Sequence, residues 1–197
     1  METSPGAGGL GRRIVVIGTT GSGKTTLARR LSQLLDIPHV ELDALNWEPD
    51  WVQAPTEVFR QRTEEALRGE AWLVDGNYSA VRDIVWPRAG TLVWLDFSFL
   101  VTLRQLLGRT LRRIASQEEL WSGNRESFRA QFLSRDSLFI WLFQTYWRRR
   151  RQLPALLMGP EYAQLTKIRL RSPEEARLWL SRLDAARQQR TAEPGRP

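Results

Sequence analysis

The sequence predicts a single α/β domain built on a five-stranded parallel sheet, and two observations support this class. Short apolar runs alternate along the chain with longer segments of helical periodicity, which is typical of parallel strands buried on both faces. A chain of 197 residues that is 42% hydrophobic also has room for one domain with a substantial core. We expect this domain to span residues 13–189, between disordered tails at 1–12 and 190–197.

The apolar runs and the helical patterns give the expected elements in order. The candidate strands are residues 14–17, 39–43, 71–75, 91–96 and 167–170. A first helix is expected over 25–35, where leucines recur on one face. A second helix is expected over 57–68, with Thr56 as its N-cap and Gly69 closing it. The last helix should start within residues 172–175, which read Ser-Pro-Glu-Glu.

Two connections exceed an ordinary crossover between strands. Residues 44–69 contain Trp47 and Trp51, and residues 98–152 are helical by pattern and hold eleven arginines against four acids. A long basic segment inside a small α/β domain is commonly a mobile lid. Near the start of this segment we expect a helix with an apolar face and a basic face, with Leu103, Leu106, Leu107, Leu111 and Ile114 opposite Arg109, Arg112 and Arg113.

The composition excludes several kinds of site. The chain has no cysteine and a single histidine, so disulfides, thiolate catalysis and histidine clusters for zinc are ruled out. Any metal should therefore be a hard ion held by oxygen, and we interpret His39 as structural. No apolar run approaches the roughly 20 residues of a membrane span, and the start lacks a signal-peptide layout, so we expect a cytoplasmic protein without a membrane partner.

A phosphate-binding loop is the most specific motif in the sequence. It follows an apolar strand, opens a helix and fits the pattern G-x-x-x-x-G-K-[ST]. Its glycines let backbone N–H groups turn toward phosphate oxygens, Lys24 should bridge the β- and γ-phosphates, and the Thr25 hydroxyl should reach magnesium. The predicted nucleotide-binding residues are Gly18, Thr19, Thr20, Gly21, Ser22, Gly23, Lys24, Thr25 and Thr26.

Elimination narrows the reaction that this loop serves. A GTPase would need an N-K-x-D motif and a transporter-type ATPase an L-S-G-G-Q motif, and the sequence contains neither. Ring ATPases need a second helical domain, which the length excludes. Small-molecule kinases that use ATP are the class left.

Further motifs carry a resemblance to a known family. These motifs are V-E-L-D-A-L-N-W near residue 40, D-G-N-Y at 75–78 and S-R-D-S at 134–137. With them and the phosphate loop, the chain resembles the nucleoside-monophosphate-kinase-like branch of P-loop proteins, which includes adenylate, shikimate and gluconate kinases. Within that branch it looks like bacterial adenylate-kinase-like or "DNA topology modulation" proteins, over about residues 13–182. The resemblance implies a three-layer P-loop kinase sandwich with strand order 2-3-1-4-5, an acceptor-binding region at 44–69 and an arginine-rich helical lid at 98–152.

The resemblance also implies roles for individual residues. Asp43 falls where shikimate-kinase-like enzymes place the carboxylate that binds the acceptor hydroxyl, and Lys24 acts in the transfer itself. Asp75 would hold magnesium together with Thr25, or bond the threonine hydroxyl. Arginines of the lid stabilise the transferring phosphoryl group in related kinases, and the expected catalytic pair is Arg109 and Arg113.

The sequence leaves the acceptor open. Adenylate kinases carry D-G-F-P-R, whose arginine grips the monophosphate, whereas Asp75-Gly76 is followed here by Asn77-Tyr78-Ser79. Arg82, one turn beyond Tyr78, is a candidate replacement, and Trp47 and Trp51 are candidates to wall a planar or apolar substrate.

Two functions therefore stand as hypotheses. The first is an ATP- and Mg²⁺-dependent phosphotransferase acting on a small nucleotide, nucleoside or polyol-like acceptor, working as a monomer or homodimer. The second is an ATP-binding regulator that contacts nucleic acid through the arginine-rich segment, including the run Arg148–Arg151, which the formal charge of +7 would permit.

Overall fold

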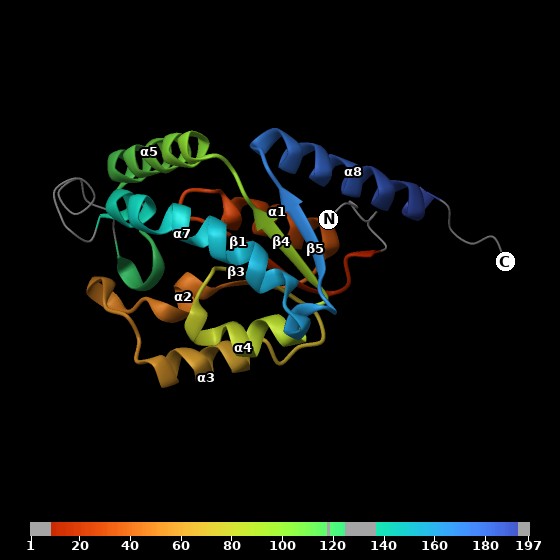
Figure 1. The fold of residues 1–197 in the computed structure, drawn as a ribbon, viewed down its shortest axis with the longest axis horizontal. Helices are drawn as coiled ribbons and strands as arrows, with labels where there is room; N and C mark the ends of the chain where they lie inside the picture. The colour runs from red at the N-terminus through yellow and green to blue at the C-terminus, as the bar shows by residue number, and fades with distance from the viewer. Residues whose placement is uncertain (1–8, 118, 125–136, 193–197) are drawn as a thin grey trace.

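A computed structural model describes residues 9–117, 119–124 and 137–192, and its centre is a five-stranded parallel sheet (Figure 1). The strand order is β2-β3-β1-β4-β5, as predicted. Neighbouring strands pair in register, with Ile14 of β1 beside Leu73 of β3 on one side and Thr91 of β4 on the other. The strands are β1 (Arg13–Gly18), β2 (His39–Glu41), β3 (Trp72–Asp75), β4 (Thr91–Leu95) and β5 (Thr166–Leu170).

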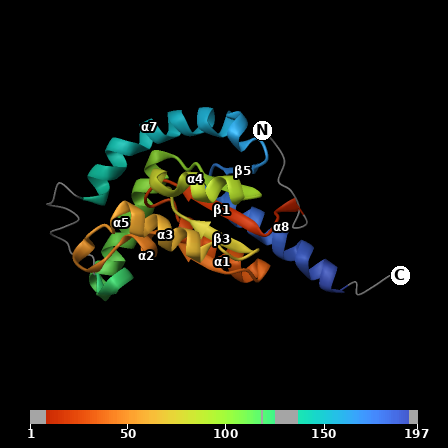
Figure 2. The same ribbon diagram turned by 90° about the horizontal axis from the view of Figure 1, so that it is seen from below.

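Helices cover both faces of the sheet and make a three-layer sandwich (Figure 2). Because side chains alternate along a strand, Ile14 and Val16 of β1 pack in the cluster that contains α1 and α8. Val15 and Ile17 pack in the opposite cluster, which contains α3, α4 and α7. The helices are α1 (Lys24–Leu35), α2 (Leu42–Asn46), α3 (Thr56–Ala66), α4 (Arg82–Val85), α5 (Phe99–Ser116), α7 (Leu138–Met158) and α8 (Pro173–Ala192).

The second strand is shorter than predicted. β2 ends at Glu41, and the chain turns directly into α2, so Asp43 lies in the first turn of a helix rather than at a strand end. The turn buries Leu42, whose side chain lies so close to Gly76 that a Cβ there would come within 2.8 Å of the leucine Cβ. The need to bury Leu42 therefore overrides the strand-like alternation of residues 39–43.

The predicted ends of α3 are also wrong. Pro55, in an extended conformation, occupies the N-cap, and Thr56 is the first helical residue. The helix ends at Ala66, before Gly69, because the following Leu67 is fully buried in the core. The last helix begins as predicted, with Pro173 as its first residue and the Glu175 N–H donating to Ser172 Oγ (3.1 Å).

The predicted apolar face of α5 is correct in part. Leu106 is buried with Leu142 and Tyr146 of α7, and Leu103 packs against this cluster. Leu107 and Leu111 are exposed, whereas Thr102 and Thr110 are buried in their place. Arg109 and Arg113 consequently lie half-buried on flanks of that inward face rather than opposite it.

Some of the predicted lid and most of the predicted tails lie outside the described residues. These are Arg125, Arg129 and Arg135, positions 134–136 of the S-R-D-S motif, and residues 1–8 and 193–197. Among the helices that the structure describes, none combines the length and apolar character needed to cross a membrane.

Candidate active site

The predicted phosphate loop connects β1 to α1 at the carboxyl edge of the sheet. Gly21 and Gly23 have φ angles of +82° and +84°, in the left-handed region where other residues are strained. Gly23 is also the N-cap of α1 and makes no side-chain cap, so the amides of the first turn face a potential anion. Thr19, Thr20 and Thr25 are half-buried along this loop, whereas Thr26 is exposed. The conformation is that of an anion-binding nest, which the sequence pattern anticipated.

Lys24 folds back over the loop that it follows. Its Nζ donates to the Thr19 carbonyl oxygen at 3.3 Å. Burial lowers the pKa of Lys24, while the carboxylates of Asp43 and Asp75 act in the opposite direction. Arg109 and Arg149 lower the pKa further. The lysine therefore belongs to a group of cations and carboxylates that gather around one loop.

Thr25 and Asp75 form the pair on which the predicted magnesium site depends. The Thr25 hydroxyl donates to Asp75 Oδ2 at 2.6 Å, and the carboxylate is 4% exposed at the end of β3. His39 Nε2 lies 3.2 Å from the other oxygen, Asp75 Oδ1. Within the described residues no cluster of three or more acidic, histidine or cysteine side chains could hold a metal alone. The oxygen pair nevertheless fits Mg²⁺, which usually takes one or two protein ligands and completes its shell with phosphates and water.

Asp43 faces the same loop from the first turn of α2. Its Oδ1 accepts a hydrogen bond of 2.5 Å from the Tyr78 hydroxyl. Burial raises the pKa of Asp43, and Lys24 and the Tyr78 bond offset some of that rise. Burial also raises the pKa of Tyr78, followed by the charge of Asp43, so the phenol stays protonated and donates. The sequence placed Asp43 at the end of the second strand, whereas it lies in the first turn of α2.

Helix α5 approaches the phosphate loop at Gly21. A Cβ on this glycine would lie 2.7 Å from Leu106 Cβ and 2.9 Å from the Thr102 carbonyl oxygen. The absence of a side chain therefore lets α5 touch the loop backbone, and this contact brings Arg109 close enough to influence Lys24. Arg113 lies one turn further along the helix.

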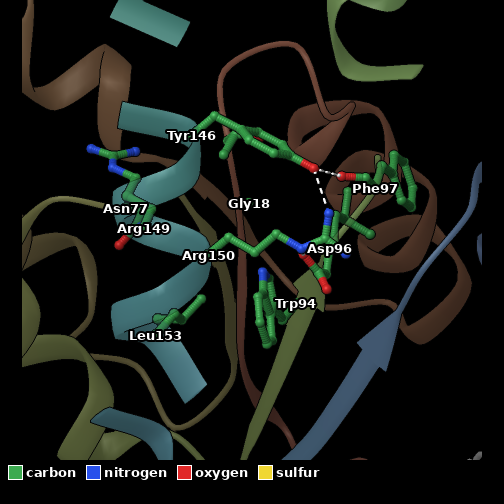
Figure 3. A pocket seen from close by; sticks show the side chains of 11 residues that line it. Gly18, Asn77, Trp94, Asp96, Phe97, Tyr146, Arg149, Arg150 and Leu153 are labelled. Carbon is green, nitrogen blue, oxygen red and sulfur yellow. Dashed lines mark hydrogen bonds and ion pairs between the residues drawn. The ribbon is translucent and has the colours of Figure 1, made fainter. Parts of the chain in front are cut away.

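Helix α7 supplies two arginines to a small pocket beside the loop, which Figure 3 shows. Arg149 and Arg150 line it together with Gly18 and Thr19 of the loop. Burial lowers the pKa of Arg149, and the charges of Arg148 and Arg82 lower it further. The other residues around this pocket are Asn77, Trp94, Leu95, Asp96, Phe97, Tyr146 and Leu153.

The sequence indicated Arg148–Arg151 only as one basic run and did not single out Arg149, which is the half-buried member of the run. Helical spacing held the information, since the buried residues of α7 recur every three or four positions and Arg149 fills a gap in that series. The buried residues are Leu142, Thr145, Tyr146, Leu153 and Leu157.

Asp96 fixes α7 to the edge of the sheet. This buried carboxylate follows β4 and accepts from Arg169 of β5 at 2.5 Å, while Arg150 Nε lies 3.2 Å from its other oxygen. Tyr146 donates to the Phe97 carbonyl oxygen at 2.8 Å and accepts from Arg150 at 2.7 Å (Figure 3). The position of Asp96 directly after a strand neighbouring β1 was the available sequence indication.

The tryptophans of the region after β2 pack on one another. The rings of Trp47 and Trp51 meet edge to face with centroids 5.6 Å apart, and Trp51 meets Trp121 at 6.4 Å. Trp47 and Trp51, which were predicted to line the substrate site, are thus each partly covered by another tryptophan. Arg82, the predicted substitute for the missing arginine, stacks over Trp86 at 5.0 Å.

Comparison with solved structures identifies the fold as that of P-loop kinases. A shikimate kinase from Bacteroides thetaiotaomicron has a TM-score of 0.50 and 18% identity, over 89% of this chain and 98% of that one. A gluconokinase from Sinorhizobium meliloti 1021 has a TM-score of 0.47 and 19% identity, over 93% and 98% of the two chains. At such low identity the likeness concerns the fold alone.

Comparison of the sequence gives a partial match. A family model described as ethanolamine utilisation – propanediol utilisation (PduV-EutP) matches residues 11–75, which hold the phosphate loop and the first three strands. A search of curated proteins finds no significant match.

Proposed function

We propose that the protein is an ATP- and magnesium-dependent phosphotransferase that acts on a small acceptor. The observation that carries this proposal is the gathering of Lys24, the Thr25–Asp75 pair and Asp43 around one phosphate loop. A carboxylate at the position of Asp43 can orient an acceptor hydroxyl and take its proton.

The loop amides and Lys24 would hold the triphosphate, with Thr25 and Asp75 as the protein ligands of Mg²⁺. The ion would supply charge neutralisation for the phosphate oxygens. Arg109, close to Lys24, would add positive charge where the phosphoryl group transfers, and Arg113 extends the same face of α5. This arrangement favours positioning and electrostatic stabilisation, which carry most of the catalysis in phosphoryl transfer.

Asp43 would orient the acceptor hydroxyl. In the transfer, the hydroxyl oxygen forms a bond to the γ-phosphorus while the bond from that phosphorus to the β–γ bridging oxygen breaks, and ADP leaves with the electron pair. The hydroxyl proton passes to the ionised Asp43 carboxylate. Tyr78 keeps this carboxylate in a fixed orientation through its 2.5 Å bond.

The cations on the acceptor side favour an acceptor that carries a carboxylate or phosphate. Arg149 lies near Arg82, although like charges repel. Burial already lowers the pKa of Arg149. Arg82 Nε is buried and has no hydrogen-bond partner among the described residues. Buried cations of this kind are stabilised when an anion lies between them.

The test is transfer of labelled γ-phosphate from Mg·ATP to a panel of monophosphates, sugar acids, nucleosides and neutral polyols. We expect a phosphorylated product from an anionic member. Lys24→Met should lower the rate by about 100- to 1,000-fold and Asp43→Asn by about 100-fold or more. Asp50→Asn is the matched control, since this exposed aspartate lies in the same region at a φ of 59° that asparagine also adopts. Slow hydrolysis of ATP without any product across the whole panel would refute the proposal.

A further inference from the structure

We propose that His39 and Glu41 are positioning residues that connect the Asp75 carboxylate to Trp121, so that the contact made by Trp121 sets how Asp75 is presented to a nucleotide-bound magnesium ion. The inference rests on the proposed function in one respect, namely that Thr25 and Asp75 hold that ion.

A continuous series of contacts runs from the phosphate loop to the segment that follows α5. Asp75 is fixed on both oxygens, by Thr25 at 2.6 Å and by His39 Nε2 at 3.2 Å. On the other side of the ring, His39 Nδ1 lies 4.0 Å from Glu41 Oε1, a packing contact that is too long for a hydrogen bond. Glu41 Oε2 then accepts from Trp121 Nε1 at 3.1 Å.

The series is shielded from water along its length. The side chains of Asp75, His39 and Glu41 are 4%, 12% and 15% exposed. Because an ionised carboxylate only accepts, Nε2 carries the proton in the contact with Asp75. The hydrogen bonds to Asp75 and to Glu41 are stronger in such surroundings than they would be in water.

Glu41 is the branch point of the series. Its Oε1 also accepts from Arg29 Nη2 of α1 at 2.7 Å, on the exposed side of the carboxylate. Arg29 and Trp121 thus hold different oxygens of one side chain. Removal of the indole donor frees Oε2, while Arg29 still holds Oε1, the oxygen nearest His39 Nδ1, so the carboxylate can turn relative to the ring.

Trp121 itself is held in place by its neighbours. The Asn124 side chain accepts from the Trp51 N–H at 2.9 Å and donates to the Glu48 carbonyl oxygen at 2.8 Å. Ser122 Oγ donates to the Trp47 carbonyl oxygen at 2.8 Å. These bonds attach residues 119–124 to the region after β2. Within this segment, the Trp121 indole is the group that contacts the β2 strand itself. The attachment and the contact with Glu41 can therefore be altered separately.

Trp121→Phe separates the two roles, since it keeps an aromatic ring beside Trp51 and removes the N–H that donates to Glu41, together with the bulk of the second ring. Ser122→Ala is the matched control, because it removes a neighbouring bond of the same segment without touching Glu41. For His39, leucine removes both ring nitrogens, whereas glutamine keeps an N–H that can donate to Asp75.

The first readout is the affinity of the full chain for a non-hydrolysable ATP analogue, measured by calorimetry with and without Mg²⁺. The ratio of the two dissociation constants isolates the contribution of the ion. Residues that orient metal ligands commonly change metal affinity by about 10- to 100-fold. We expect Trp121→Phe and His39→Leu each to reduce the ratio by about tenfold or more, their combination to reduce it no further, and His39→Gln and Ser122→Ala to keep it.

The second readout needs no nucleotide. His39 is the only histidine in the chain, so its ring ¹⁵N resonances are assigned without ambiguity. Trp121→Phe should shift these resonances in the ligand-free protein, and Ser122→Ala should leave them in place. If the wild type shows a magnesium effect but Trp121→Phe changes neither the ratio nor the resonances, the positioning role is wrong and the phosphotransferase proposal stands. If the wild type binds the analogue with no magnesium effect, the assignment of Thr25 and Asp75 fails, and the phosphotransferase proposal fails with it.

Discussion

The position of Asp43 in the site lowers the stability of the folded protein at neutral pH. Burial holds its pKa above the ordinary carboxyl value of 3.8, and Lys24 and Tyr78 offset only some of this effect. The folded state consequently binds a proton at Asp43 more tightly than the unfolded state does. Below pH 3.8 both states are protonated and the residue costs nothing, whereas stability is lost as the pH rises through the folded pKa.

Asp43→Asn is therefore expected to stabilise the protein at neutral pH, by about 1 kcal/mol, while it slows transfer. The asparagine oxygen still accepts from Tyr78, so the change removes the buried charge and little else. Urea denaturation at a series of pH values measures the effect, which should shrink toward zero as the pH approaches 3.8.

Asp36→Asn provides the control, because this aspartate is exposed and its left-handed φ of 54° suits asparagine. Equal effects of the two substitutions at every pH would mean that burial does not raise the pKa of Asp43.

Residues with a motif around them were predictable, and residues defined by packing were not. Lys24 and Thr25 follow from the spacing of the loop, because backbone geometry there allows few alternatives. Arg149 depends on which side of α7 meets the sheet, and His39 gains its contact with Asp75 only when β2 and β3 pair. No local pattern reports such neighbours.

At the scale of elements, the contact between α5 and the phosphate loop organises the site. Gly21 and Gly23 of the loop separate backbone strain from the contact with α5, since both have a left-handed φ but only Gly21 faces α5. A Cβ on Gly23 would meet no described atom within 4 Å.

Gly21→Ala should therefore destabilise the ligand-free protein more than Gly23→Ala, by about 1–3 kcal/mol, because it adds a clash with Leu106 to the shared backbone strain. Thermal and chemical denaturation of the two variants measure the difference. Indistinguishable stabilities would mean that α5 does not rest on the loop in solution.

Helices and strands were predicted correctly where a local sequence pattern determines them. The inner strands β1, β3 and β4 are apolar runs because both faces of a parallel sheet are covered, so they stand out in the sequence. The edge strands β2 and β5 alternate instead. Helix α2 did not, since five residues are too few for a helical period to be read. The face of α5 was predicted only in part, because Thr102 and Thr110 are buried beside Leu106 while Leu107 and Leu111 stay exposed.

At the scale of the whole molecule, charge and architecture support different hypotheses. A formal charge of +7 suits contact with nucleic acid, the alternative function. In the structure, however, Arg149 and Arg150 line the pocket, and Arg150 is paired with Asp96, so half of the run Arg148–Arg151 is engaged at the site. On the ground of these contacts we favour the phosphotransferase proposal over the nucleic-acid alternative.

The central claim is that the loop between β1 and α1, with Lys24 above it, binds a nucleoside triphosphate. The most direct measurement is calorimetric titration of the folded full chain with a Mg·ATP analogue at about 150 mM salt, near the ionic strength at which nonspecific contacts are weak. We predict one site per chain, and an affinity at least about tenfold lower for Lys24→Met, whose circular dichroism should match the wild type. No heat of binding from folded wild-type protein, or equal binding by the Lys24→Met variant, would contradict the claim.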